Sequence, residues 1–513
     1  MKKLYSNLLL TLTLFGTVSY SQTGTIDLTF GENGYVRNIP GAGKSIQVND
    51  AQEIYIRGKS SLIKCNPEGE IDLSFGNNGI VEYNLYNLES TSTDMLIQDD
   101  GKIVIVGNLV DGAITYVYAL RANTDGFVDT TFGNNGVFLF SSGYDDYSKT
   151  IIQTDNNSFI VGCQTVRTPT SRDFMLLKLN PSGVLDTNFG NNGVVVTDMY
   201  GRDDFLQKIT TDSNDNIYAL GRVKFPSPVN GINYFDFGLV KFTSSGTIDA
   251  TFGTNGKANY NLDYYSADDF PNFIKVNDDN SIYVSGHTHD NDGGDYELYK
   301  LAKLNSNGSM DQSFGNGGIV TILGGTILLP TVPAFQVDDK LVFSTYQTVY
   351  QSPPPTFKSL MTRVNTDGTI DTDFATEGTL ELDSNFYPRA GLVFQSQNKL
   401  LTIGGNSDGS GTVLARIDID DNIVSVNEEQ FTKHAITLFP NPSSDVLYVN
   451  ASQEDAIKYD IEIYSVVGKK LMSFENTLLN NYSINVSAFA NGVYIMKLKS
   501  DSKTITSKKF VVR

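Results

Sequence analysis

The side chains best suited to chemistry in this 513-residue chain are carboxylates that occur in adjacent pairs. Three aspartate doublets precede apolar segments at similar places in the chain, with Asp94 near the same phase of an earlier segment: Asp145-Asp146, Asp203-Asp204 and Asp268-Asp269. Grouped carboxylates can bind calcium or seat a basic group at the mouth of a channel. They can also cap turns at strand entrances, because Asp accepts hydrogen bonds from nearby backbone N–H groups. Both interpretations stay open, and no cofactor is assigned.

A second group of possible metal ligands is His287 and His289, which are separated by one residue and followed by several aspartates. Two imidazoles with carboxylates suit zinc or a similar ion. We expect this segment to lie in the loop of one repeat, where a solvated polar loop is the alternative. The third and last histidine, His434, falls in a predicted linker. No Ser-His-Asp or Cys-His arrangement is indicated, so we assign no catalytic residue.

Three connections between predicted strands differ in length from their counterparts and cover residues 222–236, 287–296 and 346–357. Insertions in repeat proteins gather on one face, which is often the binding face. These connections carry aromatic side chains that could stack on a sugar or a peptide: Tyr234, Phe235, Tyr296 and Tyr346. Alternatively, the aromatic residues only fill the loops.

All these residues belong to a repeated pattern. The phrase Gly-x-x-Asp-x-x-Phe-Gly-x-x-Gly occurs seven times, the last copy being degenerate. Its aspartates are 45 to 63 residues apart: Asp27, Asp72, Asp129, Asp186, Asp249, Asp311 and Asp371. A period of this size indicates a propeller or a solenoid. Hairpins with polar turns, such as 95–107, and strands that end in a turn, such as 176–183, complete units of four antiparallel strands.

The order of these elements indicates how the repeats close. The chain begins with a phrase that lacks its own hairpin and ends with a hairpin and strand (392–418) that lack a clear phrase. If residues 24–37 complete that last unit, no sheet edge stays open, whereas a solenoid would need caps. We then expect four apolar side chains of this segment to be buried: Ile26, Leu28, Phe30 and Val36. Residues 423–426 could supply the closing strand instead.

We therefore predict an all-β fold with a seven-bladed β-propeller over residues 22–418, closed by the N-terminal strand. The repeated phrase and the Asp-Gly-Lys hairpin resemble the delta-60 repeat family of bacterial exported proteins. The resemblance covers about 24–418 and implies a β-propeller, but it carries no catalytic signature.

Both ends of the chain indicate export. Residues 1–21 read as a signal peptide with a basic start, an apolar run and a cleavage site before Gln22. The apolar run is too short to favour a membrane anchor, and no other transmembrane segment is predicted. After a predicted linker (419–436), residues 437–513 show alternating apolar residues separated by turns, as in a small β-sandwich. The apolar residues include Ile461, Ile463, Val493 and Ile495.

The C-terminal segment closely resembles the sorting domain of the type IX secretion system of Bacteroidetes. The motifs that carry the resemblance are Phe439-Pro440-Asn441-Pro442, a strand and turn with Gly468, and Asn491-Gly492-Val493-Tyr494. The resemblance implies passage across the outer membrane by that secretion machinery, followed by release or attachment to the cell surface. An Ig-like adhesive module is the alternative.

Composition disfavours one class of partner and bears on the state of the cysteines. The formal net charge of −20 disfavours nucleic acid as a partner. The two cysteines, Cys65 and Cys163, fall at different places in the repeat, so we predict separate buried thiols. We expect a non-enzymatic propeller that binds an extracellular glycan or protein. The alternative is a polysaccharide-acting hydrolase or lyase, because propellers also host such enzymes.

Overall fold

The computed structural model describes most of the chain, and all of its described regular structure is β-strand. The described residues are 24–168, 171–226, 233–262, 268–290, 296–322, 333–336, 338–349, 356–406, 411–419, 436–451, 458–465, 470–478, 482–490, 492–500 and 503–513. The predicted signal peptide (1–21), most of the predicted linker, the alternative closing strand (423–426) and Gly468 lie outside the described residues.

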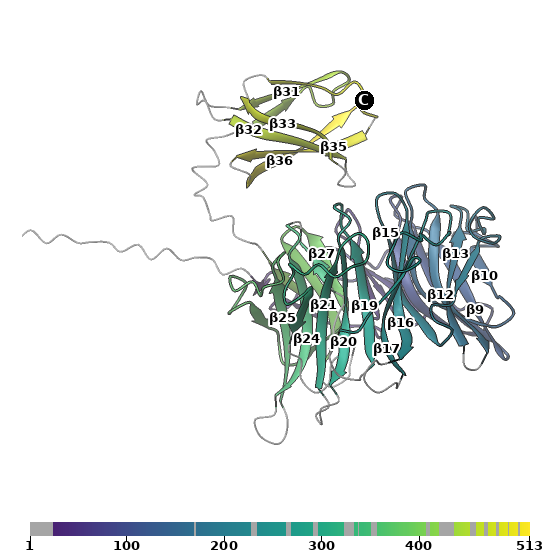
Figure 1. Ribbon diagram of the computed structural model, residues 1–513. Helices are drawn as coiled ribbons and strands as arrows, with labels where there is room; N and C mark the ends of the chain where they lie inside the picture. The colour runs from purple at the N-terminus through teal and green to yellow at the C-terminus, as the bar shows by residue number, and fades with distance from the viewer. Residues whose placement is uncertain are drawn as a thin grey trace, which may run out of the picture. The chain divides into compact units, whose positions relative to one another are not determined.

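The chain divides into compact units, and the larger one spans Gln22–Asp421. Its described strands form small antiparallel sheets, which we number 1 to 7 (Figure 1). Sheets 1 to 3 contain β3 (Ser45–Val48), β4 (Ile54–Arg57), β5 (Ser61–Cys65) and β6 (Ile80–Glu82); β7 (Glu89–Ile97), β8 (Ile103–Asp111), β9 (Ile114–Ala122) and β10 (Val137–Phe140); and β11 (Asp145–Gln153), β12 (Phe159–Thr168), β13 (Ser171–Leu179) and β14 (Val194–Thr197).

Sheets 4 to 6 repeat the four-stranded order. They contain β15 (Asp204–Thr211), β16 (Ile217–Pro226), β17 (Asn233–Phe242) and β18 (Lys257–Tyr260); β19 (Asp269–Val276), β20 (Ile282–Asp290), β21 (Tyr296–Leu304) and β22 (Ile319–Ile322); and β23 (Ala334–Phe335), β24 (Leu341–Val349), β25 (Thr356–Val364) and β26 (Thr379–Glu381). Sheet 7 contains β27 (Phe386–Ser396), β28 (Lys399–Asn406), β29 (Thr412–Asp418) and two N-terminal strands, β1 (Thr25–Ile26) and β2 (Tyr35–Ile39).

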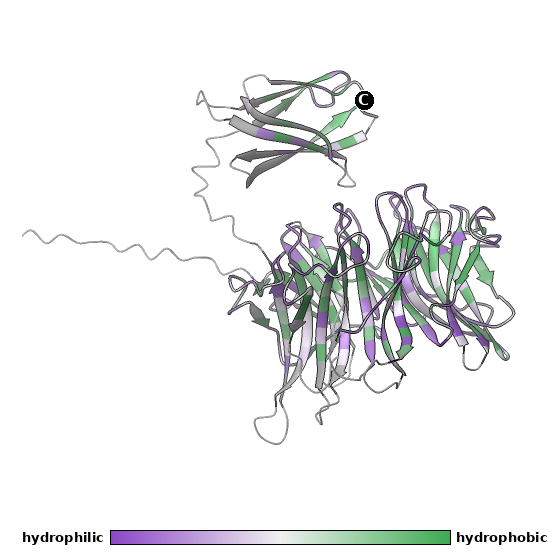
Figure 2. Ribbon diagram, viewed as in Figure 1, coloured by the Kyte–Doolittle hydropathy of each residue, from purple (hydrophilic) through white to green (hydrophobic). Residues whose placement is uncertain are grey.

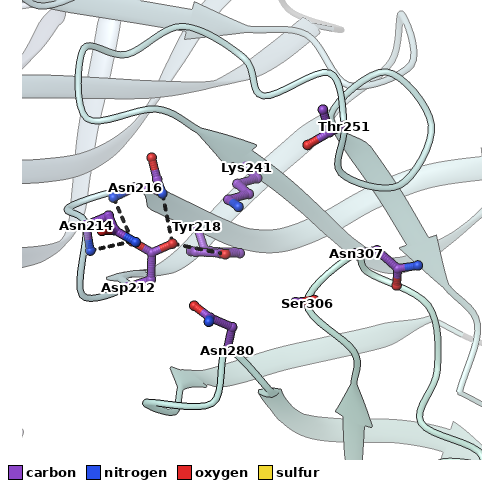
Figure 3. A pocket seen from close by; sticks show the side chains of 9 residues that line it. All are labelled: Asp212, Asn214, Asn216, Tyr218, Lys241, Thr251, Asn280, Ser306 and Asn307. Atoms are coloured by element: carbon purple, nitrogen blue, oxygen red, sulfur yellow. Dashed lines mark hydrogen bonds between the residues drawn. The ribbon is translucent and has the colours of Figure 1, made fainter.

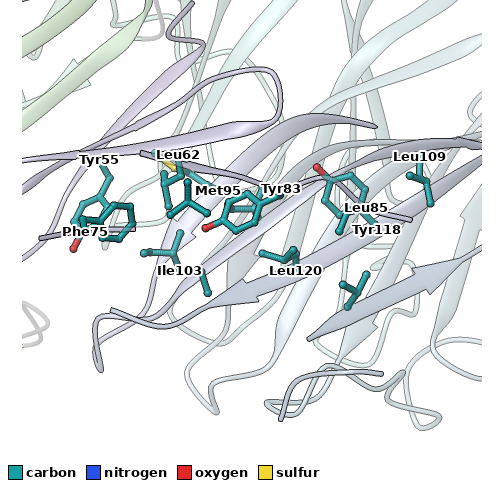
Figure 4. Packing of buried hydrophobic residues seen from close by; sticks show 14 residues of the cluster. Tyr55, Leu62, Phe75, Tyr83, Leu85, Met95, Ile103, Leu109, Tyr118 and Leu120 are labelled. Carbon is teal, nitrogen blue, oxygen red and sulfur yellow. The ribbon is translucent and has the colours of Figure 1, made fainter. Parts of the chain in front are cut away.

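Strands inside these sheets are covered on both faces. The β8 strand is accordingly buried without alternation from Ile103 to Gly107. Hydrophobic residues fill the strands and hydrophilic residues gather in the connecting turns (Figure 2). An apolar cluster fills each space between successive sheets, and the cluster between sheets 1 and 2, with Tyr55, Phe75 and Tyr118, is shown in Figure 4. A further cluster joins Phe30 and Leu414 of sheet 7 to Ile54 of sheet 1.

The N-terminal strands pair with the last strand of the repeats. Thr25 pairs with Asp418, and Tyr35 pairs with Ala415. Close packing of this segment against sheet 6 requires a glycine. Gly24 (φ 74°) lies so close to the Phe374 ring of that sheet that any Cβ would clash. Phe30 is fully buried, whereas Leu28 is 70% exposed, so its predicted burial is wrong. Leu28 is one of the two positions between Asp and Phe in the phrase, which face solvent.

The repeated aspartate has a structural role that its spacing alone did not show. In the third copy of the phrase, Asp129 Oδ1 accepts hydrogen bonds from the Thr131 N–H (3.0 Å) and Oγ1 (2.6 Å), which fixes the turn. Its Oδ2 accepts from Arg121 Nε (2.8 Å) and Lys102 Nζ (3.0 Å). Asp27 binds Thr29, Arg416 and Lys399 in the same way. Each phrase therefore joins its turn to the strand before it.

Replacing this aspartate should destabilise the protein in a pH-dependent way. Burial raises the pKa of Asp129, but hydrogen bonds from Thr131, Lys102 and Arg121 outweigh it and hold the pKa well below its usual range. The ion pair therefore stabilises the fold above about pH 4 and loses its effect as the pH falls further. At pH 7 we expect Asp129→Asn to cost about 3 kcal/mol, because Arg121 loses its buried partner.

Urea unfolding at pH 7 and pH 3 measures this difference. The difference in the free energy of unfolding between wild type and Asp129→Asn should be smaller at pH 3 than at pH 7. The exposed Asp99→Asn variant serves as the control and should change stability little at either pH. An equal loss at both pH values would contradict the assigned ion pair.

The C-terminal unit contains Asn422–Arg513 and has two sheets. One has three strands, β30 (Ile436–Phe439), β31 (Val446–Ala451) and β34 (Tyr482–Asn485); the other has four, β33 (Lys470–Leu478), β32 (Lys458–Ser465), β35 (Gly492–Ser500) and β36 (Lys503–Val512). Leu447 and Ile484 of the first sheet share one core with Ile461 and Ile463 of the second. In β35, Tyr494 and Met496 are buried. This strand therefore faces the core with these two residues rather than with Val493 and Ile495, as the sequence pattern had indicated.

Cys65 and Cys163 are both free and buried, which confirms the prediction. Among the described residues, none forms a helix of the length and apolar character needed to cross a membrane.

Candidate functional site

The aspartate doublets lie at the start of the first strand of a sheet and bind the preceding sheet. The first aspartate of each doublet accepts a backbone N–H at the start of the third strand of that sheet: Asp145 from Thr115 (2.8 Å), Asp203 from Arg172 (3.2 Å) and Asp268 from Phe235 (3.0 Å). The second aspartate is fully buried and accepts a backbone N–H just beyond the fourth strand: Asp146 from Ser142 (2.6 Å), Asp204 from Met199 (2.7 Å) and Asp269 from Leu262 (3.2 Å). Each doublet thus links two sheets.

These bonds place the doublets at three separate sheet boundaries, each engaged with its own backbone partners. Asp94 does not share their position, contrary to our expectation. It lies in the middle of β7, where it accepts the Met95 N–H (3.0 Å) and lies 3.5 Å from Lys208 Nζ of β15. Asp94 lies closer to the hairpin turn that follows it than the doublets do, and its place in the ladder matches that of Thr150 in β11.

The three variable connections are mostly extended hairpins rather than loops. Strands β16 and β17 stay paired with each other as far as Pro226 and Asn233. Strands β20 and β21 stay paired as far as Asp290 and Tyr296. His287 and His289 therefore lie in strand β20, and their expected loop position is wrong. His287 stacks on Phe270 with ring centroids 4.8 Å apart.

The aromatic candidates on these hairpins occupy different environments. Tyr346 is 8% exposed and its ring packs on Tyr387 at 4.5 Å. Tyr234 and Phe235 are partly exposed. The side chains of His289 and Tyr296 lie outside the described residues.

The partly exposed candidates border a cluster that the sequence did not single out, which we call the arginine–phenylalanine cluster. The Arg222 guanidinium lies 4.3 Å from the Phe205 ring, 4.8 Å from the Phe235 ring and 4.9 Å from the Phe270 ring. Arg172 approaches the Phe205 ring at 5.1 Å. The rings come from β15, β17 and β19, so sheets 4 and 5 build the cluster together.

The cluster has a positive centre in an otherwise acidic chain. Burial lowers the pKa of Arg222, the Asp268 carboxylate opposes this, and the nearby Arg172 adds to it. The Nε atom of Arg222 is buried, and none of the residues that the structure describes forms a hydrogen bond with it. A guanidinium held between rings can bind a carboxylate or sulfate while the rings stack on an apolar surface. A single arginine with three phenylalanines gives no sequence motif, so only alignment of the repeats could have drawn attention to it.

A polar pocket of about 460 Å³ lies between the turns of sheets 4 and 5 (Figure 3). Its lining residues are Asp212, Asn214, Asn216, Tyr218, Lys241, Thr251, Asn280, Ser306 and Asn307. Asp212 accepts the N–H groups of Asn214 (2.9 Å) and Asn216 (3.0 Å), and Lys241 pairs with Asp249 (3.2 Å). The charged groups of the pocket are thus engaged in holding turns and strands.

One doublet residue, Asp204, meets two carboxylates that the sequence analysis did not single out. Asp173, Asp198 and Asp204 each place a carboxylate oxygen within 4.8 Å of the others. Burial, opposed by the Met199 N–H and helped by the other two carboxylates, raises the pKa of Asp204 to about 8. Burial likewise raises the pKa of Asp173.

Comparison with known families supports the export signal at the C-terminus. Residues 437–513 match the family described as a secretion system C-terminal sorting domain. Residues 98–132 and 278–314 match the family described as a domain of unknown function (DUF5122) beta-propeller. This chain is a β-propeller protein with a type IX secretion sorting tail. The propeller is therefore secreted or attached to the cell surface, by way of the periplasm.

The sorting motif lies against the last strand of its own unit. Asn441 Oδ1 accepts the Val511 N–H (2.9 Å), and the ring of Phe439 stacks on Tyr448 at 5.6 Å. Phe439, Pro440 and Asn441 lie before β31, as does Pro442, and Gly492 pairs with Val512.

The propeller has distant structural neighbours of several kinds. Drosophila Semaphorin 2a is 9% identical, with 93% of this chain and 97% of that chain covered and a TM-score of 0.43. The NanB sialidase of Streptococcus pneumoniae is 9% identical, with 76% and 71% covered and a TM-score of 0.37. An endo-arabinase of Bacteroides thetaiotaomicron is 11% identical, with 54% and 95% covered and a TM-score of 0.29. A search of curated proteins finds no match.

Proposed function

We propose that this protein is a non-enzymatic seven-bladed propeller that binds an extracellular glycan or protein after export. A signal peptide at residues 1–21 directs it to the periplasm, and residues 437–513 engage the type IX machinery. The partner presents an acidic group to the arginine–phenylalanine cluster. The partly exposed Arg222 guanidinium, held against three phenylalanine rings, is the observation that carries the proposal.

The N-terminal strands close the ring in this proposal. The pairing of β1 and β2 with β29 supports closure, as does the apolar cluster that joins sheets 7 and 1. Closure leaves the two faces of the ring, rather than a sheet edge, as the binding surfaces.

Several features favour binding over catalysis. Asp204, the acid with a strongly raised pKa, is fully buried, and Asp173 beside it is 2% exposed. A glycoside hydrolase needs its two carboxyl groups on either side of a substrate bond. Carboxyl groups closed off from solvent in this way do not reach a polysaccharide. The partly exposed Arg222, Phe235 and Tyr234 instead provide charge and ring surface for recognition.

A binding screen with acidic and neutral ligands tests the proposal. Full-length protein should bind glycans or peptides that carry carboxylate or sulfate groups and should ignore their neutral counterparts. The Arg222→Gln variant should bind at least about tenfold more weakly, because a charge-assisted hydrogen bond is lost. The control is Lys59→Gln, an exposed cation of another sheet, which should bind as wild type does.

Arg222→Lys keeps the charge but loses the planar group and should show intermediate binding. Thermal melts of every variant separate loss of binding from loss of folding. Equal binding by wild type and a folded Arg222→Gln, or turnover of a polysaccharide, would contradict the proposal.

A further inference from the structure

The carboxylates of Asp173, Asp198 and Asp204 meet at the boundary between sheets 3 and 4. Asp173 is in β13, Asp198 directly follows β14, and Asp204 begins β15. One carboxylate oxygen of each lies within 4.8 Å of one from each of the others. Asp173 and Asp204 are buried, whereas Asp198 is exposed and opens the cluster to solvent.

Two buried oxygen atoms in this cluster have no hydrogen-bond partner among the described residues: Asp173 Oδ1 and Asp204 Oδ1. Three other oxygens of the cluster have partners. Asp204 Oδ2 accepts the Met199 N–H (2.7 Å), Asp198 Oδ1 accepts the Gly201 N–H, and Asp173 Oδ2 lies 3.6 Å from Arg167 Nε. A buried carboxylate oxygen without a partner is costly, so this arrangement calls for a positive group between the carboxylates.

The next sheet boundary has the same arrangement with an amide in place of one carboxylate. Asp236 of β17, Asn261 after β18 and Asp269 at the start of β19 hold the corresponding places. There Asn261 Nδ2 donates to Asp236 Oδ1 at 3.3 Å, so an amide replaces the third carboxylate. Asp269 accepts the Leu262 N–H just as Asp204 accepts that of Met199. The amide thus gives Asp236 a hydrogen-bond donor, which Asp173 Oδ1 lacks among the described residues of the first boundary.

Of the cations that the structure describes nearby, neither Lys257 nor Arg167 fills this role at the first boundary. Lys257 Nζ donates to the backbone carbonyls of Asp198 (2.7 Å) and Met199 (3.2 Å). Arg167 approaches Asp173 only at Oδ2, and its side chain is half exposed.

We propose that Asp173, Asp198 and Asp204 bind a divalent cation that prefers oxygen ligands, such as Ca²⁺. Three carboxylates without nitrogen or sulfur ligands suit Ca²⁺ or Mg²⁺ rather than zinc. The ion joins sheet 3 to sheet 4 where the next boundary uses an amide. It is independent of the ligand that binds the arginine–phenylalanine cluster.

Calorimetric titration and thermal melts of the full-length protein, stripped with EDTA, test the site with CaCl₂ and MgCl₂ as probes. Wild type should bind one ion and melt several degrees higher at saturation, because the ion binds the folded state. Asp198→Asn copies the amide of the next boundary and should bind at least about tenfold more weakly, without loss of folding. The reciprocal Asn261→Asp should add a second site.

Absence of binding by both ions in wild type would overturn the proposal. So would an unchanged affinity in a folded Asp198→Asn. A melting temperature that neither ion changes, but that rises on acidification, would indicate that the carboxylates share a proton instead. That result would also overturn the proposal.

Discussion

A chain that ends at residue 436 is expected to accumulate in the periplasm as a folded propeller. The secretion machinery recognises the C-terminal sorting domain, which this truncation removes completely. The propeller has its own cores and sheets, so its folding does not depend on the missing residues. Export should fall to near zero while the total amount of protein changes little.

Immunoblots of periplasm, cell surface and medium measure this effect in a bacterium that has the secretion system. The matched control fuses residues 437–513 to an unrelated periplasmic protein, which should then appear outside the cell. A point variant refines the test. Ile463→Asp places a charge in the core of the sandwich and should block export by unfolding that unit alone. Normal levels of truncated protein in the medium would contradict the role of the tag.

A chain that begins at Gly41 is expected to lose most of its stability and to aggregate. Deletion of the N-terminal strands removes Phe30, Tyr35 and Ile39, which are at most 6% exposed. Burial of each such side chain contributes roughly 1.5–3 kcal/mol. The loss is therefore on the order of 5 kcal/mol, against a typical total of about 5–15 kcal/mol. The deletion also uncovers the free edge of β29, which can pair with other chains.

Urea unfolding and light scattering measure both effects on the exported form of the chain. A disulfide provides a second, independent test of the strand pairing. Thr25 and Asp418 are direct partners, so Thr25→Cys with Asp418→Cys should form a crosslink under oxidising conditions. Thr25→Cys with Ser182→Cys, a turn residue of sheet 3, is the control and should stay reduced. A chain from Gly41 that is as stable and monomeric as the full chain would show that another segment closes the ring.

The sequence alone determined the all-β class, the propeller repeat and the sorting tail. Each depends on patterns that recur in register: the phrase with Asp and Phe, the hairpin turns, and the motifs from Phe439 onward. The repeat predicts the order of the strands within each unit, because every copy of the phrase and the hairpin can form the same local hydrogen bonds. Even so, the phrase did not reveal that Asp129 pairs with Arg121, or that Leu28 faces solvent.

Only the tertiary structure decided which side chains meet. Arg222 joins rings from three strands of two sheets, and Asp173, Asp198 and Asp204 converge across a sheet boundary. Strand ends also depended on context, since the hairpin with His287 extends further than its turn residues indicated. The physical reason is that local patterns report hydrogen bonding within one unit. Contacts between units depend on how neighbouring sheets pack, and a pattern that is the same in every unit carries no information about a contact found at only one boundary.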